Sequence, residues 1–366
     1  MCASVLLIPH GFQPSYERGF ANGLSRNGVR VELIASDRTP IDEIDSKVMI
    51  NNLRGSQNPR RTKLRKATNL LAYLVRLGKR LVFNKADTVH LTGMLLGGTG
   101  WAAIMECHIY KLIAKRFFLT VHNIQPHDKE SAKRKGILKR LYAIPDKLVV
   151  HTAQMQHILI DEYAVEPERV VVMHHGVDDI PAHVDVPAPA DELRVLLFGG
   201  VLPYKGIDIF LDALEHCTDF SVVAKIVGES RNPAYADTIK KLIPQVPAHH
   251  VIEWVSGFIP EAEVQHYFEQ ADLVALPYRH IDQSGVLFTA FRFGVPVVAF
   301  NVGSFAEYLP AFAGRIASEQ TPQSFAASLH AFYLNRTTYN RTAIRNYAAS
   351  FSWDETVTSL IPHYSA

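Results

Sequence analysis

The hydrophobic residues along the chain alternate between two kinds of pattern. Short runs of β-branched and other apolar residues are separated by longer stretches in which apolar residues recur at helical spacing. In the first half of the chain, these runs are SVLLIP, VRVELIAS, TVHLTG, RFFLTVHN, KLVVHT and RVVVMHH. Buried strands that alternate with amphipathic helices are typical of a parallel sheet covered by helices on both faces. The first half therefore predicts an α/β domain.

The alternation is interrupted by the segment HHGVDDIPAHVDVPAPADEL, which is rich in proline and acidic residues. This composition indicates a linker. Beyond it, the short apolar runs resume with RVLLFGG, SVVAKIVG, HVIEWVSG, DLVALPY and PVVAFN. We therefore expect a second α/β domain that begins near Leu193, so that residues 1–180 form one domain and residues 190–349 form the other.

The chain has 366 residues, of which 48% are hydrophobic and 20% are charged, as is typical of a soluble globular protein with about two domains. No apolar run approaches the roughly 20 residues that span a bilayer, and the start MCASVLLIPHGF lacks the features of a signal peptide. We expect a cytoplasmic protein. Its three cysteines, Cys2, Cys107 and Cys217, lie far apart, so neither a disulfide framework nor a zinc site is expected.

The net charge of +2 conceals an asymmetry between the two halves of the chain. Residues 1–180 contain 26 Lys and Arg against 17 Asp and Glu, which gives a net charge of +9. Residues 181–366 contain 12 Lys and Arg against 19 Asp and Glu, which gives −7. The first domain is therefore the basic one.

One loop of the second domain has the composition of an anion site. In FGGVLPYKGIDIFLDAL, Gly199 and Gly200 follow a predicted strand and let the backbone approach a ligand, while Pro203 shapes the turn. The helix expected from Gly206 would offer unpaired N–H groups beside Lys205, so a phosphate would suit this loop. No Walker motif occurs, and no G-x-G-x-x-G follows the first strand. On these residues alone, a surface lysine at a helix start is the alternative.

A second loop, with several shorter segments, extends this interpretation to a known family. LPYRHIDQSGVL and FGVPVVAFNVGSFAE, together with FGGVLPYKGIDIFLDAL, VVVMHHGVDD, TVHNIQPHD and the closing FSWDETV, resemble in order and spacing the retaining glycosyltransferases of family 4, the group 1 glycosyltransferases. The resemblance covers nearly the whole chain. It implies the α/β GT-B fold, in which two Rossmann-like domains face each other with a cleft between them. It also implies that the first domain holds the acceptor, the second holds a nucleotide-sugar, and the C-terminal helix, residues 350–366, packs back on the first domain.

The resemblance assigns donor-binding roles to three loops of the second domain. Lys205 would bind the donor diphosphate and act in catalysis, a role that suits a compact ammonium group beside phosphate oxygens. Gly257 and Phe258 match the loop beside the nucleobase. The loop whose backbone amides meet the phosphate and the transferred sugar corresponds to Gln283, Ser284, Gly285, Val286 and Leu287.

Two residues of the first domain complete the site that the resemblance implies. Gly11, in IPHGFQPSYERGF, matches the glycine-rich turn that approaches the donor after the first strand. His122, in TVHNIQPHD, matches the histidine that faces the donor sugar, and it is the second candidate catalytic residue. A histidine at the end of a strand is often structural, which is the alternative role for His122.

The chain departs from the family pattern at two positions of the donor site. Family members commonly have an arginine where this chain has Gly200, and a glutamate where it has Thr289. Asp282 is the acidic residue nearest in sequence to the second position. We include Gly200, Asp282 and Thr289 among the donor-binding residues and expect a variant of the donor site.

The resemblance implies transfer of a hexose from a nucleotide-diphosphate sugar to a glycan or lipid-linked acceptor in polysaccharide or glycolipid biosynthesis. Negative charge develops on the leaving diphosphate, where a cation and preorganised N–H groups stabilise it. In such enzymes the leaving phosphate helps to deprotonate the incoming hydroxyl on the same face, so the anomeric configuration is retained without a protein nucleophile.

Several expectations accompany this assignment. No D-x-D motif lies in a plausible loop, so we expect neither a catalytic metal nor a cofactor, and we expect no nucleic-acid partner. The donor nucleotide, whether UDP, GDP or ADP, is left open. A nucleotide-sugar epimerase or a noncatalytic sugar-nucleotide-binding protein of the same fold is the alternative function.

A basic segment of the first domain suggests a further partner. No acidic residue occurs between Ser46 and Ala86, residues 60–85 supply nine Lys and Arg, and a second basic cluster, KESAKRKGILKR, follows the His122 loop. Helices with one apolar face and cationic flanks dock peripherally on anionic membranes. The alternative is that the apolar face packs on the domain's own sheet. The apolar residues at helical spacing are Leu64, Ala67, Leu71, Leu74, Val75, Leu81 and Val82.

Overall fold

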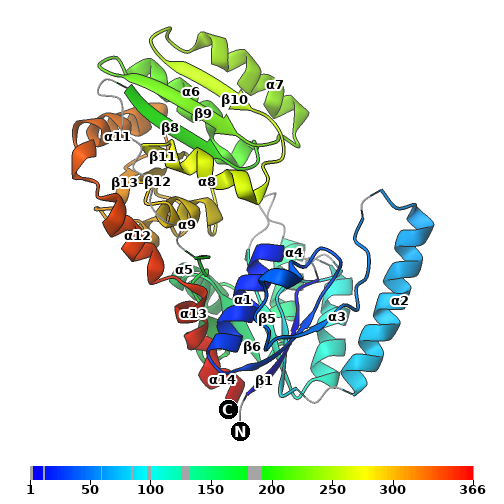
Figure 1. Cartoon of the computed structure of the whole chain (residues 1–366). Helices are drawn as coiled ribbons and strands as arrows, with labels where there is room; N and C mark the ends of the chain where they lie inside the picture. Colours follow the sequence, from blue (N-terminus) through cyan, green and yellow to red (C-terminus); the bar gives the residue numbers. More distant parts are fainter. Residues whose placement is uncertain are drawn as a thin grey trace. The chain divides into compact units, whose positions relative to one another are not determined.

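The computed structural model of the chain describes residues 3–10, 13–58, 60–83, 86–96, 100–124, 132–179 and 192–365. The chain divides into two compact units, each built on one parallel sheet with helices packed against it (Figure 1). The first unit comprises Met1–Asp178 and Phe351–Ala366, and the second comprises Asp179–Ser350. The prediction of an α/β fold with two parallel sheets is therefore confirmed.

The sheet of the first unit has seven strands, all paired in parallel. They are β1 (Ser4–Ile8), β2 (Arg30–Ile34), β3 (Met49–Asn51), β4 (Thr88–Leu91), β5 (Arg116–Thr120), β6 (Lys147–Val150) and β7 (Val170–Val172). Their spatial order is β3-β2-β1-β4-β5-β6-β7, so the order reverses at β1. Val5 of β1 accordingly lies opposite both Val31 and Thr88. In open parallel sheets, ligands bind beyond the carboxyl ends of the strands at such a reversal.

Two hydrophobic clusters cover the two faces of this sheet. The helices of the first unit are α1 (Pro14–Arg26), α2 (Lys63–Val82), α3 (Trp101–Ile113), α4 (Ala132–Tyr142), α5 (Ala153–Asp161), α13 (Trp353–Thr356) and α14 (Ile361–Ser365). Side chains alternate along β1, so Leu6 and Ile8 join the cluster under α2, α3, α4 and α5. Val5 and Leu7 join the other cluster, under α1, α13 and α14.

The C-terminal segment is held in the first unit by an indole ring that lies against glycines. A Cβ atom on Gly19 of α1 would lie 2.0 Å from Nε1 of Trp353, and one on Gly176 would lie 2.1 Å from its Cδ2. Neither position has room for a side chain. The Val177 N–H also donates a hydrogen bond to the Phe351 carbonyl over 2.7 Å. These contacts fasten α13 against α1.

The second unit has a sheet of six parallel strands in the order β10-β9-β8-β11-β12-β13. They are β8 (Glu192–Phe198), β9 (Ser221–Val227), β10 (Val251–Val255), β11 (Leu273–Leu276), β12 (Val297–Phe300) and β13 (Gly314–Ala317). β8 is the strand at which the order reverses, because it pairs with β9 on one side and with β11 on the other. The helices are α6 (Ile207–Ala213), α7 (Pro233–Leu242), α8 (Glu261–Glu269), α9 (Gly285–Arg292), α10 (Phe305–Tyr308), α11 (Pro322–Leu334) and α12 (Arg341–Ala349).

Cys107 and Cys217 are buried free thiols. Burial raises the pKa of each to about 12, so both are protonated near neutral pH. Cys2 lies outside the described residues. Over the part of the chain that the structure describes, none of the helices combines the length and apolar character needed to cross a membrane.

His90 of β4 joins the first sheet to the C-terminal helix. Its Nε2 lies 2.8 Å from the Thr120 hydroxyl of β5, and its Nδ1 contacts the Tyr364 hydroxyl of α14. The ring is fully buried, and burial, together with nearby His122, lowers the pKa of His90 to about 3. The ring is therefore neutral in the folded protein over most of the acidic range.

We expect His90 to make the first unit less stable in acid. Below its ordinary pKa of 6.5, the unfolded chain binds a proton that the folded chain does not, until the folded pKa near 3 is reached. One such group lowers stability by about 1.4 kcal/mol per pH unit in this window. His90→Gln should reduce the slope by that amount, measured by hydrogen exchange of β4 and β5 amides between pH 7 and pH 5. An unchanged slope would contradict the neutral, buried state of the ring.

Candidate functional site

Two loops of the second unit meet where their strands end. One follows β8 and closes in the short helical turn Pro203–Lys205, and the other follows β11. β8 and β11 are parallel neighbours, so both loops leave the sheet at the same edge. Gly206 adopts a left-handed conformation (φ +63°), and a Cβ atom there would lie 1.9 Å from the Pro277 carbonyl oxygen. Only glycine allows the two loops to approach this closely.

An ion pair and a backbone hydrogen bond reinforce this junction. The Arg279 N–H donates to the Tyr204 carbonyl over 2.7 Å, and the Arg279 guanidinium donates to both oxygens of Asp208 over 3.0 and 2.6 Å. Burial acts to raise the pKa of Asp208, but the hydrogen bonds from Arg279 and Tyr235 outweigh it and lower the pKa. The loop after β11 is thereby tied to the start of α6.

Lys205 turns inward from this junction and is almost fully buried. Its ammonium group donates to the Tyr278 hydroxyl over 2.7 Å and to the Phe198 carbonyl over 3.2 Å, and the Tyr278 hydroxyl is also hydrogen-bonded to Ser284. Burial lowers the pKa of Lys205. Within the described residues, no carboxylate forms an ion pair with this ammonium group. A buried cation that is held only by neutral oxygens is a favourable place for an anionic ligand.

The loop after β11 continues into the start of α9. Gln283 precedes the helix, and its side-chain Nε2 is buried without a hydrogen-bond partner among the described residues. Ser284 is the N-cap, so the first amides of α9, those of Gly285 and Val286, have no partner within the helix. A buried amide donor beside unpaired backbone N–H groups can bind an acceptor such as a phosphate or sugar oxygen.

The remaining residues predicted in this loop have internal roles. The Thr289 hydroxyl donates to the Gly285 carbonyl over 2.9 Å, one turn earlier in α9, and Leu287 is buried. The Asp282 carbonyl accepts the Ser304 N–H over 3.2 Å. A Cβ atom on Gly303 would lie 1.8 Å from the Ile281 carbonyl oxygen, so the loop after β12 packs directly against the loop after β11.

The other predicted donor residues follow β8 and β10 at the same edge of the sheet. A Cβ atom on Gly200 would meet nothing closer than 3.7 Å, so this position, where relatives of the predicted family commonly have arginine, has room for a side chain. Gly257 follows β10 with φ +146° and open space around it, and Phe258 is 85% exposed. The structure therefore brings Gly200, Lys205, Gly257, Phe258 and residues 282–289 to one sheet edge.

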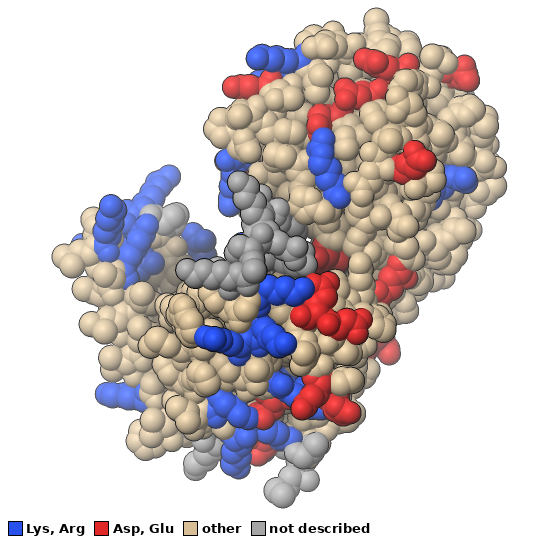
Figure 2. Space-filling view, turned by 180° about the vertical axis from the view of Figure 1, so that it is seen from behind, with Lys and Arg blue, Asp and Glu red and all other residues tan. Residues whose placement is uncertain are grey.

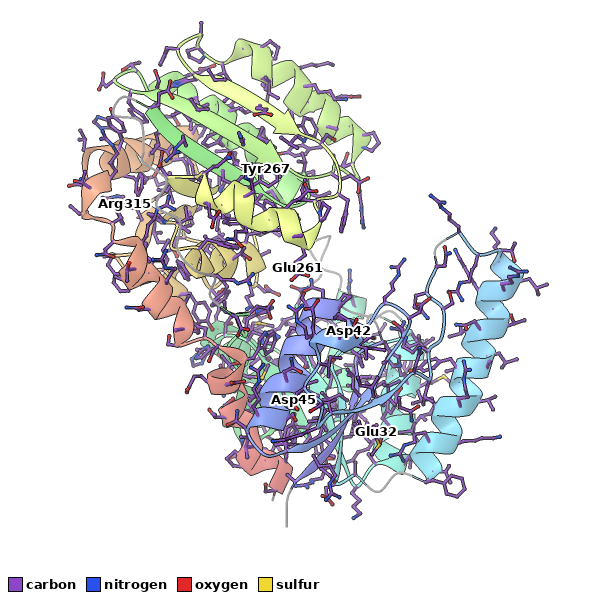
Figure 3. All side chains as sticks on the ribbon, viewed as in Figure 1. Glu32, Asp42, Asp45, Glu261, Tyr267 and Arg315 are labelled. Carbon is purple, nitrogen blue, oxygen red and sulfur yellow. The ribbon has the colours of Figure 1, made fainter. Side chains whose placement is uncertain are left out.

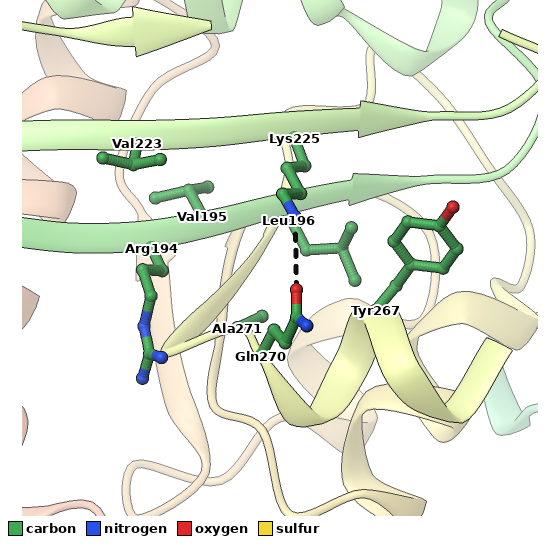
Figure 4. Close-up of a pocket in the computed structure, with 8 residues that line it drawn as sticks. All are labelled: Arg194, Val195, Leu196, Val223, Lys225, Tyr267, Gln270 and Ala271. Carbon is green, nitrogen blue, oxygen red and sulfur yellow. Dashed lines mark hydrogen bonds between the residues drawn. The ribbon is translucent and has the colours of Figure 1, made fainter. Parts of the chain in front are cut away.

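A separate pocket of about 350 Å³ lies between the second sheet and α8 (Figure 4). Tyr267, labelled on α8 in Figure 3, forms one wall. Both cations of the pocket have partners, because Arg194 pairs with Asp272 over 2.6 Å and Lys225 donates to Gln270 over 3.2 Å. The pocket lies on the face of the sheet and shares no lining residue with the strand-end loops. Its lining residues are Arg194, Val195, Leu196, Val223, Lys225, Tyr267, Gln270 and Ala271.

His122 of the first unit follows β5 and packs in a group of buried aromatic and imidazole rings. Its Nε2 lies 2.8 Å from the Thr92 carbonyl, its Nδ1 lies 3.1 Å from Nε2 of His151, and its ring centre lies 4.9 Å from that of Tyr16. His151 in turn directs its Nδ1 at the Met173 carbonyl over 2.9 Å. Both ring nitrogens of His122 therefore have contacts inside the unit.

These contacts determine where the protons lie. A carbonyl oxygen only accepts, so Nε2 of His122 and Nδ1 of His151 carry the hydrogens in the neutral rings. The two nitrogens that face each other then both lack hydrogen, and a single added proton would convert their contact into a hydrogen bond shared by the pair. Burial lowers the pKa of His122 to about 4, and it also lowers the pKa of His151 well below its usual value. The pair is thus neutral near pH 7 and can take up one proton.

Other predicted features of the first unit lie nearby or outside the described residues. Gly11 falls outside them. The preceding residue, His10, has a left-handed backbone (φ +49°), and its Nδ1 lies 2.8 Å from the Gly93 carbonyl. Across the described ranges, which omit 125–131 and 180–191 among others, no group of three or more His, Cys, Asp or Glu residues could hold a metal ion.

Sequence reasoning did not identify Tyr278 and Arg279, which position the site. Tyr278 contacts Lys205 and Ser284, and Arg279 ties the two loops together. Both directly follow the strand that ends in LPYR, so their place after a predicted strand was the available signal. His151, the neighbour of His122, stands in KLVVHT at the end of another predicted strand. The contact between His151 and His122 becomes apparent only once β5 and β6 are paired.

Two family models match the chain in succession. The model described as Glycosyltransferase Family 4 matches residues 16–179, and the model described as Glycosyl transferases group 1 matches residues 193–335. Each match falls within one unit of the structure.

Solved structures share the fold of the whole chain at low sequence identity. Sucrose-phosphate synthase from Thermosynechococcus elongatus has a TM-score of 0.75 and 15% identity, over 100% of this chain and 98% of that chain. The Anabaena protein HepE, in a complex with UDP and glucose, has a TM-score of 0.73 and 17% identity, over 100% of both chains. The fold is therefore GT-B, the two-domain α/β fold of these glycosyltransferases.

Curated relatives extend over most of the chain. The D-inositol 3-phosphate glycosyltransferase of Geodermatophilus obscurus is 24% identical over 380 aligned residues, which cover 94% of this chain and 82% of the relative. The enzyme of that name from Catenulispora acidiphila is 30% identical over 61% of this chain and 57% of the relative. With the two family models, these similarities establish a glycosyltransferase. The chain belongs to the group 1 glycosyltransferases of family 4.

The loop junction makes a prediction about Gly206. Gly206→Ala should lower the free energy of unfolding of the second unit by about 1–3 kcal/mol, because alanine is strained at positive φ and its Cβ would overlap the Pro277 carbonyl. Thermal unfolding would measure the loss, and faster hydrogen exchange at the Arg279 amide would locate it at the junction. Gly200→Ala is the matched control, since its Cβ would make only ordinary contacts. Equal effects of the two substitutions would contradict the junction.

Proposed function

We propose that the chain is a retaining, metal-independent hexosyltransferase that uses a nucleotide-diphosphate sugar and acts on a glycan or lipid-linked acceptor in polysaccharide or glycolipid biosynthesis. The observation that carries the proposal is the buried ammonium group of Lys205, which has neutral oxygen partners and no carboxylate partner among the described residues. A diphosphate supplies the missing negative charge. The unpartnered Nε2 of Gln283 beside the start of α9 supports the same ligand.

The proposed chemistry follows from where charge develops. Cleavage of the bond between the anomeric carbon and the phosphate oxygen leaves two electrons on the diphosphate. Lys205 stabilises that charge as a cation already held in place by Tyr278 and Phe198, and the amides of Gly285 and Val286 add oriented N–H groups. A preorganised site of this kind requires little rearrangement as the bond breaks.

Retention of configuration is proposed from the family. The leaving diphosphate accepts the proton of the acceptor hydroxyl as that hydroxyl attacks the anomeric carbon from the same face. Lys205 and the N–H groups would hold the diphosphate in place for this proton transfer. We therefore assign the charge stabilisation to the chain's own groups, with no resident cofactor or metal in the reaction.

The remaining assignments complete the donor site. We infer that Phe258 and Gly257 lie beside the nucleobase, and that Gln283, Ser284 and Leu287 shape the phosphate and sugar pocket. The open space at Gly200 and the intrahelical hydrogen bond of Thr289 support a variant ribose contact, which we assign to Asp282. From the first unit, we assign Gly11 to the donor approach and His122 to the sugar.

Experiment can identify the donor nucleotide and the acceptor. The relatives are named for an inositol phosphate acceptor, and the Anabaena structure contains UDP and glucose. A screen of UDP, GDP and ADP by thermal shift would identify the nucleotide, because a ligand that binds only the folded state raises its apparent stability. Incubation of the protein with nucleotide-sugars, with and without acceptor, distinguishes transfer from the alternative functions, since an epimerase alters the donor and a noncatalytic binder leaves it unchanged.

The mechanism predicts the stereochemistry of the product. With an α-linked donor, the new glycosidic bond should also be α, because the acceptor attacks on the face that the diphosphate leaves. One-dimensional proton NMR of the product reports the anomeric coupling directly. Activity should be the same with EDTA and with added divalent cations. An inverted linkage, or activity lost in EDTA and restored by metal, would overturn this mechanism.

The proposed role of Lys205 predicts an effect on the binding of the nucleoside diphosphate. Lys205→Ala should weaken binding of the nucleoside diphosphate roughly ten- to a hundredfold and lower turnover, because a charge-assisted contact contributes about 1.5–3 kcal/mol. Titration calorimetry would measure the affinity. Lys225→Ala is the matched control, since it removes a lysine from the pocket below α8 and should leave nucleotide affinity unchanged. If Lys225→Ala weakens binding and Lys205→Ala does not, the nucleotide occupies the pocket instead of the strand-end loops.

A further inference from the structure

Helix α2 has a wider apolar face than the core of the first unit covers. Only Tyr73, Leu77 and Leu81 of this helix are buried. Leu64, Leu71, Val75 and Val82 recur every seven or four residues and therefore lie on one side of the helix. These four side chains are between 51% and 74% exposed. Packing on the domain's own sheet, the alternative considered from the sequence, thus accounts for only part of the apolar face.

Helix α3 repeats this arrangement, which sequence reasoning did not identify. Its inner side buries Ala103, Ile104, Cys107 and Tyr110. Its outer side has large apolar residues spaced by four, four and three positions, which places them on one line along the helix. These residues are between 51% and 84% exposed, and they are Trp101, Met105, Ile109 and Leu112.

The two helices are neighbours on the same face of the sheet. Their buried residues belong to one hydrophobic cluster, and the ring of His10 lies 5.8 Å from that of Tyr73 in α2 and 6.4 Å from that of Tyr110 in α3. Figure 1 shows α2 and α3 side by side at the edge of the first unit. Their outward apolar residues can therefore act together, and we call them the α2–α3 face.

The exposed charges of α2 are all basic, whereas Lys111 of α3 pairs with Asp146. The basic residues of α2 at positions 63, 65, 66, 76 and 79 are exposed, and within the described part of the chain none of them forms an ion pair. On α4, Arg140 holds its guanidinium carbon 5.1 Å from the ring centre of Trp101. Figure 2 shows Lys and Arg side chains gathered over the first unit, with a group at its outer edge. The α2–α3 face is thus apolar, flanked by unpaired cations.

We propose that the α2–α3 face docks on an anionic membrane surface, with its apolar side chains at the level of the acyl chains and its cations at the headgroups. The inference rests on the proposed function, because it places the first unit where a lipid-linked acceptor is presented. Apolar burial and attraction to anionic headgroups together give reversible peripheral binding. A second copy of the chain fits less well, because pairing this face with itself would bring unpaired cations together without an acidic partner.

The test is co-sedimentation of the whole chain with vesicles of phosphatidylcholine alone or with about one third phosphatidylglycerol, in the absence of donor and acceptor. We expect at least roughly tenfold stronger partitioning onto the anionic vesicles, lost as salt rises from about 0.1 to 0.5 M. The double variant Met105→Ser, Ile109→Ser should lower partitioning roughly tenfold at low salt. The double variant Arg65→Gln, Arg76→Gln should lower both partitioning and its salt dependence.

Matched controls come from the second unit. Leu334→Ser removes an apolar side chain of similar exposure, and Lys240→Gln with Lys241→Gln removes two exposed cations. Both should bind vesicles like the parent. Equal binding to neutral and anionic vesicles, no binding, or controls that weaken binding as much as the α2–α3 variants would overturn the proposal. A dimer in sedimentation velocity that Met105→Ser, Ile109→Ser dissociates, without vesicle binding, would assign the face to a second copy.

The vesicle-binding test and the test of hexose transfer can succeed or fail independently. Vesicle binding needs no chemistry, so it can succeed even if the chain transfers no hexose. Conversely, transfer to a water-soluble acceptor should be the same for the parent and the α2–α3 variants, because these residues lie on the outer sides of their helices and none of them is assigned to the donor site. Loss of soluble-acceptor activity in these variants would contradict a role confined to docking.

Discussion

Parallel pairing of one strand with two neighbours is the constraint on which the site of the second unit depends. β8 pairs with β9 and with β11, so the loops after these strands leave the sheet at one edge. The contact between Gly206 and the Pro277 carbonyl then joins two of these loops and directs Lys205 toward Tyr278. The same reversal of strand order occurs at β1 of the first unit, near the loops that carry His10 and Thr92.

The electrostatics of the site are local and opposite in sign to the charge of the unit around it. Residues 179–350 contain 12 Lys and Arg against 18 Asp and Glu, a net charge of −6, yet Lys205 is buried and meets no carboxylate among the described residues. Burial lowers the pKa of Lys205, because removing the charged ammonium group from water costs free energy. An anionic ligand offsets that cost, whereas an internal carboxylate would stabilise the empty site and compete with the ligand.

Much of the fold was predictable from the sequence because strand runs and loop residues are local signals. The runs RVLLFGG and DLVALPY became β8 and β11, and the order of the loop motifs predicted the family. Contacts between distant loops were not predictable in this way. Tyr278 and His151 make their contacts with Lys205 and His122 only because strand pairing brings distant loops together. The apolar pattern of α2 was compatible with either burial or exposure. The exposure of Leu64 and Leu71 was decided by how much of α2 the sheet can cover.

The surplus apolar surface of the first unit therefore has a physical implication. A helix on a sheet needs an apolar stripe only as wide as the layer beneath it, and Tyr73, Leu77 and Leu81 already provide that stripe in α2. Further large apolar residues on the outer sides of α2 and α3 add nothing to the core and favour association. Cations without partners beside them make anionic partners favourable and self-association unfavourable. Under the two proposals made above, anions would be recognised by a buried lysine in one unit and by an exposed, basic apolar face in the other.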